Sequence, residues 1–190
     1  MASGGVHQGV VAVLESIPYS GIEDIIESWR RSGQKAFILL LDCVQDPQNL
    51  GALIRTACCA GCHGVVLPRD RSASLTPSAI KASAGAPAHI PVARVTNLAA
   101  TLDSLRREAI WIIGAAPDAA VDIFKANLNI DIALVMGGEE KGLRPIIRKK
   151  CDEMVRIPTL GAVSSLNVSV AAGIFLFEIL RQRLTGAVST

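Results

Sequence analysis

Short apolar runs recur along the chain, and they constrain its fold more than any other feature. Phe37–Leu41 is continuously apolar, and Ile110–Ile113 and Leu134–Met136 have the same character. An unbroken apolar run of this length is typical of a strand in a parallel sheet that is covered on both faces. Helical patterns separate the runs, as in Ile22–Arg31, where residues 22, 25, 26 and 29 are apolar. The sequence therefore predicts an α/β fold with a mostly parallel sheet and helices on both faces.

Length and composition narrow the possible functions. A chain of 190 residues suits one well-buried domain, and 4% aromatic residues imply an aliphatic core. The formal charge of +2 is too small to indicate a nucleic-acid-binding protein by itself, so an RNA partner must be argued from local clusters. No apolar run approaches the roughly 20 residues of a membrane span. No His, Cys and Asp residues have metal-site spacing, so we predict neither a membrane nor a metal partner.

The five cysteines lie in apolar or helical segments, which suits a reducing compartment, and we predict a cytoplasmic protein. Cys59 and Cys62 have the spacing of a redox pair. Redox pairs usually begin a helix, where the helix dipole lowers the thiol pKa. This pair instead ends a predicted helix, with Gly61 as the terminating residue. A structural role is therefore favoured for both cysteines.

Polar or glycine-rich loops follow three of the predicted strands. They are Cys43–Gly51, Gly137–Gly142 and Gly161–Ser165. Ligands of α/β folds bind beyond the carboxyl ends of the strands, so we expect a site at these loops. Arg55 lies in the helix after the first loop, for which Asn49 is the predicted N-cap. Its guanidinium either extends along the helix flank into solvent or faces the loops, and the pattern leaves both open.

Three motifs together resemble one enzyme family, whereas the usual nucleotide-binding and serine-hydrolase motifs are absent. The first motif is Asn49-Leu50-Gly51 with Arg55. The others are Gly137-Gly138-Glu139-Glu140-Lys141-Gly142-Leu143 and Ser164-Ser165-Leu166-Asn167-Val168-Ser169. Their order and spacing resemble the SpoU branch of the SPOUT RNA methyltransferases over nearly the whole chain. Further segments resemble the subgroup that methylates a guanosine 2′-hydroxyl in 23S ribosomal RNA, namely His7–Ala12, Lys81–Ala86 and Arg94–Leu98.

This resemblance implies a fold and a cofactor beyond what the residue patterns predict. The family fold carries a deep trefoil knot at its C-terminal end, which general topology rules would not propose. S-adenosylmethionine (AdoMet) would bind in the knot, and apolar side chains would hold its adenine. The implied cofactor-binding residues are Gly137, Ile157, Leu166, Met136, Gly138 and Pro158. Family members are homodimers through their C-terminal helices, and Leu166–Arg181 is apolar around most of its girth, as an interface helix would be.

The resemblance also implies a mechanism, in which a sulfonium methyl group moves in line to a ribose 2′-oxygen. Arg55 would be the central catalytic residue, and Asn49, Glu140, Ser165 and Asn167 would position it and the RNA. A guanidinium stays protonated at neutral pH because its pKa is above about 12, so a general-base role is disfavoured for Arg55. We expect Arg55 to stabilise the developing alkoxide or to hold the adjacent phosphate.

RNA contacts are expected from basic residues near these loops, namely Arg69, Arg71, Arg144, Arg148, Lys149 and Lys150. We predict an arm and first helix at residues 1–33, a methyltransferase domain at 34–184 and a tail at 185–190. Close relatives carry an extra N-terminal RNA-binding domain, and this sequence is expected not to include one. A transfer-RNA methyltransferase of the same family and a catalytically silent RNA-binding or assembly factor remain alternatives.

Overall fold

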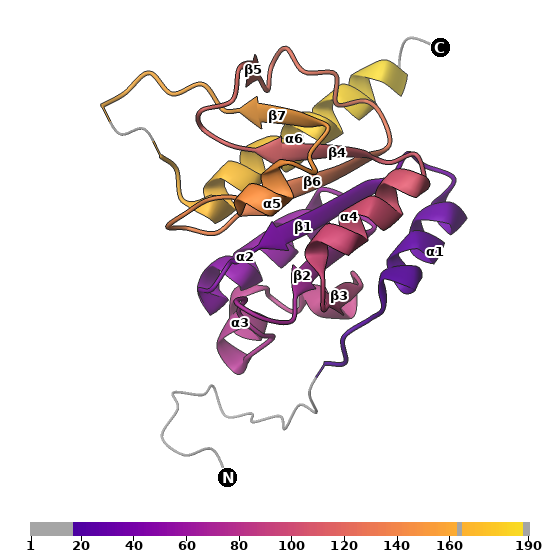
Figure 1. Cartoon of the computed structure of the whole chain (residues 1–190). Helices are drawn as coiled ribbons and strands as arrows, with labels where there is room; N and C mark the ends of the chain where they lie inside the picture. Colours follow the sequence, from indigo (N-terminus) through magenta and orange to yellow (C-terminus); the bar gives the residue numbers. More distant parts are fainter. Residues whose placement is uncertain (1–16, 163–164, 188–190) are drawn as a thin grey trace.

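The computed structural model describes residues 17–162 and 165–187, so His7, Gln8 and Ser164 lie outside the described residues. Strands and helices alternate along most of this part of the chain (Figure 1). The helices are α1 Ile22–Ser32, α2 Pro47–Cys59, α3 Pro77–Ala82, α4 Leu98–Arg107, α5 Pro145–Arg148 and α6 Val168–Ala187, with a short 3-10 helix at Ala86–Ala88. The strands are β1 Phe37–Asp42, β2 Gly64–Pro68, β3 Val92–Val95, β4 Trp111–Ala115, β5 Val121–Asp122, β6 Ile132–Gly137 and β7 Glu153–Arg156.

The strands form one sheet in the order β3-β2-β1-β6-β4-β7-β5. Every pairing between these strands is parallel, which confirms the predicted parallel sheet. Central β1 is buried along its whole length, as its continuous apolar run requires. The carboxyl ends of β1, β6 and β4 therefore meet at one edge, where β1 pairs with β6 as far as Asp42 and Gly137. The knot implied by the resemblance stays a prediction.

Helices cover both faces of the sheet, as predicted, and each face has its own aliphatic core (Figure 1). Leu39 and Leu41 of β1 pack in the core that contains the apolar faces of α2 and α6. Ile38 and Leu40 belong to the other core, which α1, α4 and Ile147 of α5 complete. Successive strand residues point to opposite faces, so one apolar run supplies both cores. Among the described residues, no helix is long and apolar enough to cross a membrane.

Local signals set most helix starts, with one correction. Asn97 caps α4 as predicted, because its Oδ1 accepts a hydrogen bond from the backbone N–H of Ala100. The prediction that Asn49 caps α2 is wrong. The helix begins three residues earlier than predicted, at Pro47, and the Asp46 carboxylate accepts the cap bond from Gln48 N–H. Proline suits the first helical position, because its missing N–H would have no intrahelical partner there. Asn49 therefore lies within the first turn, and its side chain is free for another role.

Arg183 holds the C-terminal helix against the amino ends of β1 and β6. Its guanidinium donates hydrogen bonds to the carbonyls of Lys35, Ala36 and Ile130. It also lies over the Phe37 ring, 4.7 Å from the centroid. These contacts fix α6 along the sheet, so that its first turn reaches the carboxyl edge.

Candidate functional site

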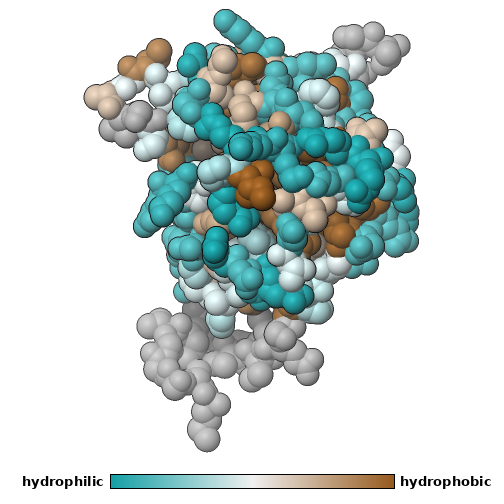
Figure 2. Space-filling model, in the orientation of Figure 1, coloured by the Kyte–Doolittle hydropathy of each residue, from teal (hydrophilic) through white to brown (hydrophobic). Residues whose placement is uncertain are grey.

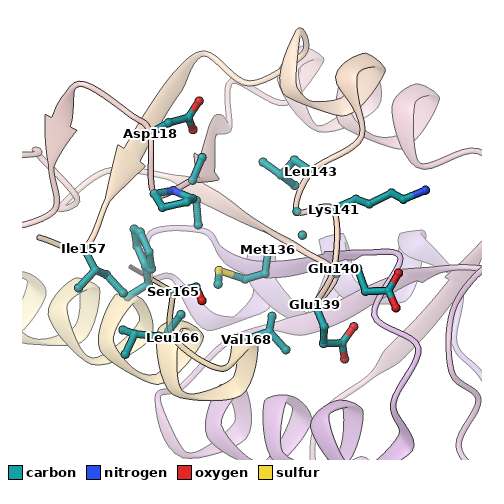
Figure 3. Close-up of a pocket in the computed structure, with 18 of the residues that line it drawn as sticks. Asp118, Met136, Glu139, Glu140, Lys141, Leu143, Ile157, Ser165, Leu166 and Val168 are labelled. Carbon is teal, nitrogen blue, oxygen red and sulfur yellow. The ribbon is translucent and has the colours of Figure 1, made fainter. Parts of the chain in front are cut away.

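A cavity of about 420 Å³ opens at the carboxyl ends of β4, β6 and β7, beside the start of α6. Figure 3 shows Ile157 and Leu166 near one another on one side of it, with the Met136 side chain reaching into it from the sheet. The predicted cofactor residues Met136, Gly137, Gly138, Ile157 and Leu166 all line the cavity. Pro158 follows Ile157 but is not among the lining residues. The cavity thus gathers residues of the second and third motifs, whereas no residue of the first motif lines it.

Gly137 at the end of β6 and Gly138 in the following 138–144 loop have a packing role that the sequence pattern did not indicate. A Cβ atom on Gly137 would overlap the backbone of Gly142 and Leu143. A Cβ atom on Gly138 would overlap the carbonyl of Cys43, which follows β1. We expected glycine here because it lets the backbone approach a ligand closely. In the structure, glycine is required because backbone meets backbone, and this folds the loop around the cavity.

A buried ion pair anchors the far end of the same loop. Asp42, the last residue of β1, is fully buried. Its carboxylate accepts a hydrogen bond from Arg144 Nε at 2.7 Å and another from the Arg144 backbone N–H at 2.8 Å. Because residues 138–143 line the cavity, this pair fixes both the backbone and the side chain at the point where the loop leaves it.

A chain of amide and carboxylate hydrogen bonds joins the three motifs. Asn167 donates from Nδ2 to Oδ1 of Asn49 at 3.1 Å, and Asn49 donates from its own Nδ2 to Glu139 Oε1 at 2.9 Å. The Asn167 Oδ1 atom in turn accepts bonds from Ser169 at the start of α6. Asn49 and Asn167, both predicted catalytic residues, are thus directly connected. Neither lines the cavity, but Glu139 does.

Glu139 is the functional candidate that the sequence pattern missed. We assigned the positioning role in this loop to Glu140, which also lines the cavity but makes no hydrogen bond to Asn49 or to Arg55 within the described residues. Two adjacent carboxylates in a glycine-rich loop give no local signal of which one turns toward α2. Only the path of the loop decides this.

The remaining predicted catalytic residues are Arg55 and Ser165. Ser165 lines the cavity next to Leu166. Arg55 is exposed on α2 and does not line it. Among the described residues, the Arg55 side chain makes no ion pair, and both orientations predicted from the sequence stay open.

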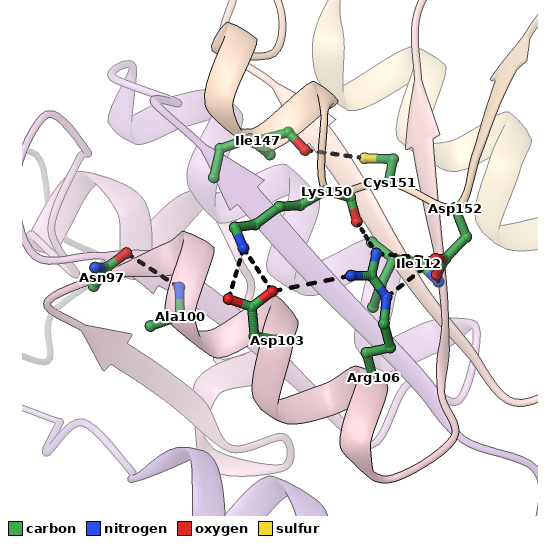
Figure 4. Close-up of polar contacts among 9 residues, drawn as sticks. All are labelled: Asn97, Ala100, Asp103, Arg106, Ile112, Ile147, Lys150, Cys151 and Asp152. Atoms are coloured by element: carbon green, nitrogen blue, oxygen red, sulfur yellow. Dashed lines mark hydrogen bonds and ion pairs between the residues drawn. The ribbon is translucent and has the colours of Figure 1, made fainter.

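Several of the basic residues predicted to contact RNA are engaged with carboxylates. Arg148 donates two hydrogen bonds to Asp118 at 3.0 and 2.9 Å, beside the cavity. Lys150 binds both carboxylate oxygens of Asp103 on α4 at 2.6 Å, as Figure 4 shows. Arg144 is bound to Asp42 as described above. Arg69, Arg71 and Lys149 are exposed and are absent from these ion pairs.

Figure 4 also shows why Lys150 has a structural position. Arg106 of α4 binds the Lys150 carbonyl at 2.6 Å and the Asp152 carboxylate at 2.9 Å. Asp152 Oδ2 accepts the backbone N–H of Ile112 in β4. Together these contacts fasten α4 to the turn between α5 and β7, which brings β7 and its following loop to the cavity.

Within the part of the chain that the structure describes, the cysteines and acidic residues do not form a second kind of site. Cys62 is buried, and burial raises the pKa of its thiol well above the usual range, whereas Cys59 is exposed. A thiol with a raised pKa is a poor nucleophile, which agrees with the structural role predicted for Cys62. In residues 17–162 and 165–187, no group of His, Cys, Asp and Glu residues is arranged to hold a metal ion.

Comparison with known proteins agrees with the motif pattern. The model of the SpoU rRNA Methylase family matches residues 36–177. The 23S rRNA (guanosine-2′-O-)-methyltransferase RlmB of Yersinia pestis is 48% identical over 181 residues, which are 95% of this chain and 73% of that protein. YacO of Bacillus subtilis (strain 168) is 43% identical over 179 residues, which are 94% of this chain and 72% of that protein. Its name describes it as a TrmH family tRNA/rRNA methyltransferase.

A solved structure extends the likeness to three dimensions. The SpoU methyltransferase AviRb from Streptomyces viridochromogenes, in complex with the cofactor AdoMet, superposes with a TM-score of 0.75 at 31% identity. The match covers 80% of this chain and 59% of the AviRb chain. The chain described here therefore spans less than two thirds of that protein.

Proposed function

Because this chain belongs to the SpoU rRNA methylase family, we propose that it transfers a methyl group from AdoMet to a ribose 2′-hydroxyl of RNA, with a guanosine of 23S ribosomal RNA as the substrate. The observation that carries the proposal is the 420 Å³ cavity, whose lining comes from motif segments far apart in the sequence. Its size lies in the range of small-molecule sites, which extends from about 300 to 1,000 Å³.

The cavity suits AdoMet chemically. Ile157, Leu166 and Met136 offer apolar surface for the adenine, and the loop backbone at Gly137 and Gly138 supplies polar groups for the ribose and the methionine portion. Bound there, AdoMet would supply an electrophilic methyl group on a sulfonium. The surrounding residues would hold that group, exclude water and present one face to the incoming ribose.

The residues around the cavity would then orient the RNA. In the proposed transfer, AdoMet would supply the methyl group, the ribose 2′-oxygen would accept it, and the hydroxyl proton would pass to solvent. The Asn167–Asn49–Glu139 chain supports a positioning role for these side chains, because it links the segment before α6 to the cavity loop. Arg55 lies outside the cavity lining, so we propose that its guanidinium acts from the RNA side, on the developing alkoxide or the adjacent phosphate.

We further propose that two copies of the chain associate through α6. Val170, Phe177 and Leu184 are about half exposed or more and are spaced seven residues apart, which places them on one side of the helix. The opposite side, including Phe175 and Ile179, is already buried against the rest of the chain. Phe177→Glu is expected to give a monomer by analytical ultracentrifugation at micromolar concentration, where the wild type sediments as a dimer. A monomeric wild type would contradict this proposal.

Binding of S-adenosylhomocysteine, the product form of the cofactor, tests the cavity assignment. Isothermal titration calorimetry of the wild type is expected to give a micromolar dissociation constant. Leu166→Arg places a charge on the apolar wall and should abolish binding. Leu160→Arg is the matched control, because Leu160 lies on the same loop, is fully exposed and is not part of the cavity lining. Absence of binding by the folded wild type would refute the methyltransferase proposal and favour a silent RNA-binding factor.

Substrate choice is tested separately. The YacO name keeps transfer RNA as the second candidate. Transfer of a labelled methyl group is expected to unmodified 23S ribosomal RNA and not to transfer RNA transcripts, and the reverse result would select the second candidate. Residues 34–184 are proposed as the methyltransferase domain, and a cytoplasmic location follows from the proposed ribosomal substrate.

A further inference from the structure

A second cavity, of about 490 Å³, lies at the same edge of the sheet, beyond the ends of β2 and β3. It shares no lining residue with the cofactor cavity. The 138–144 loop lies between the two, because residues 138–143 line the first cavity and Arg144 lines the second. The other walls come from Pro68, Asp70 and Arg71, from Thr96–Ala99 and from Ile146–Ile147.

Two arginines, Arg71 and Arg144, line this second cavity. Arg144 is oriented by the buried Asp42 through its Nε, and its terminal nitrogens make no hydrogen bond within the described residues. Arg71 is exposed and absent from the ion pairs of the described chain. Both arginines act on the same thiol: burial and Asp42 raise the pKa of Cys43, whereas Arg144 and Arg71 lower it. One carboxylate, Asp70, also lines the cavity, and Asp42 balances the charge of Arg144, so the cavity offers an anion the unbound nitrogens of the two arginines rather than an excess of positive charge.

The start of α4 adds positive potential. Leu98 and Ala99, in the first turn of this ten-residue helix, line the cavity. The Asn97 side chain satisfies the N–H of Ala100, whereas the earlier amides of a helix have no intrahelical partner. Free amides and the positive end of the helix dipole favour an anion, and a phosphate most of all.

An exposed apolar side chain lies against the charged groups. Ile146 lines the cavity and is 57% exposed. In Figure 2 a small apolar patch over the region of α5 is surrounded by hydrophilic surface. Guanidinium groups beside an apolar contact suit a nucleotide, whose phosphate needs charge and whose ribose and base do not.

We propose that the second cavity holds a phosphodiester group of the RNA strand, flanking the nucleotide whose ribose is methylated. Arg71 and Arg144 bind the phosphate oxygens, the start of α4 donates from its amides, and Ile146 contacts the adjoining nucleoside. The proposal rests on the proposed methyltransferase function. It assigns to Arg144 two roles: anchoring the cofactor loop through Asp42 and binding RNA through its terminal nitrogens.

Fluorescence anisotropy with a labelled single-stranded RNA of twelve nucleotides tests the proposal. Arg71→Gln is expected to weaken binding about tenfold, since one charge-assisted hydrogen-bonded contact is lost. The slope of log K against log salt should fall by about 0.7, the value for one phosphate on a single strand. Asp70→Asn should strengthen binding, because it removes a negative charge from the same cavity. Arg107→Gln, at the opposite end of α4, has the same charge change and should leave both affinity and slope unaltered.

The outcomes separate this proposal from the proposed function. All these variants should keep wild-type affinity for S-adenosylhomocysteine, because none of the changed residues lines the cofactor cavity. Arg71→Gln could instead keep the RNA affinity and salt slope of the wild type while still binding the cofactor product. That result would show that the second cavity is not an RNA site and would leave the proposed methyltransferase function unaffected. Binding of inorganic phosphate is measured in the same two proteins. If Arg71→Gln weakens phosphate binding but not RNA binding, the second cavity is a free-phosphate site, and the RNA proposal is overturned.

Discussion

Asp42→Asn tests whether burial, rather than short distance, makes an ion pair important for stability in this protein. Asp42 is fully buried, and its two oxygens accept separate hydrogen bonds from Arg144 at 2.7 and 2.8 Å. Asparagine keeps the size of the side chain but replaces one acceptor with an NH₂ group, which then faces another donor. The variant therefore loses a bond and the compensating charge, while the Arg144 guanidinium stays partly desolvated.

The expected cost follows from these contacts. Removing one partner of a buried ion pair costs about 3–5 kcal/mol. The Arg144 side chain is 33% exposed, so solvent compensates part of the loss, and we expect a value near the lower end, about 3 kcal/mol. For a chain of this size, each kcal/mol lowers the melting temperature by about 2–4 °C, so the expected decrease is about 6–12 °C.

Urea unfolding followed by circular dichroism, at one fixed protein concentration, measures this change. Asp118→Asn is the matched control, because its ion pair with Arg148 has similar distances of 2.9–3.0 Å but both side chains are well exposed. The control is expected to unfold at the wild-type urea concentration. Equal destabilisation by the two variants, or an Asp42→Asn protein as stable as the wild type, would refute the argument from burial.

Three further predictions concern the site and the pH dependence of stability. Glu139→Ala should lower the rate of methyl transfer about tenfold or more, because it removes the hydrogen bond to Asn49. Glu140→Ala should lower the rate less. Equal effects of the two variants in a radiolabel assay would contradict the positioning role of Glu139. Gly138→Ala should weaken S-adenosylhomocysteine binding in calorimetry, because the added Cβ would overlap the Cys43 carbonyl and displace the loop. An unchanged dissociation constant would show that the loop is not fixed by this contact. Burial and Arg183 lower the pKa of His63, whose Nδ1 accepts a hydrogen bond from the Phe37 N–H. The folded protein therefore favours the neutral imidazole. The contribution of His63 to stability should be full above the unfolded-state pKa of about 6.5 and should decline as the pH falls below that value. Urea midpoints between pH 8 and 5.5 measure this decline, and it should be smaller in His63→Gln.

Local patterns in the sequence predict most of the secondary structure because they depend on neighbouring residues. The apolar run Phe37–Leu41 forms a central strand of a parallel sheet, and the Asn97 cap begins α4 as expected. The N-cap of α2 was misassigned because Asp46 and Asn49 are both good capping residues. Pro47 is the signal that distinguishes them, since proline is favoured at the first helical position.

For the candidate site, too, some features depend on neighbouring residues and others on contacts between distant parts of the chain. Local features of the sequence predict that the loop after β6 and the segment before α6 line the cavity. They do not predict that Ala115–Asp118 lines it, nor that the Cys43–Gly51 loop lies outside its lining. Long-range packing determines which side chains act within these segments. It directs Glu139 rather than Glu140 to Asn49, gives Arg144 a buried partner and pairs Lys150 with α4. The physical reason is that each choice depends on a hydrogen-bonding partner dozens of residues away, whose position is set by the packing of the sheet and its helices.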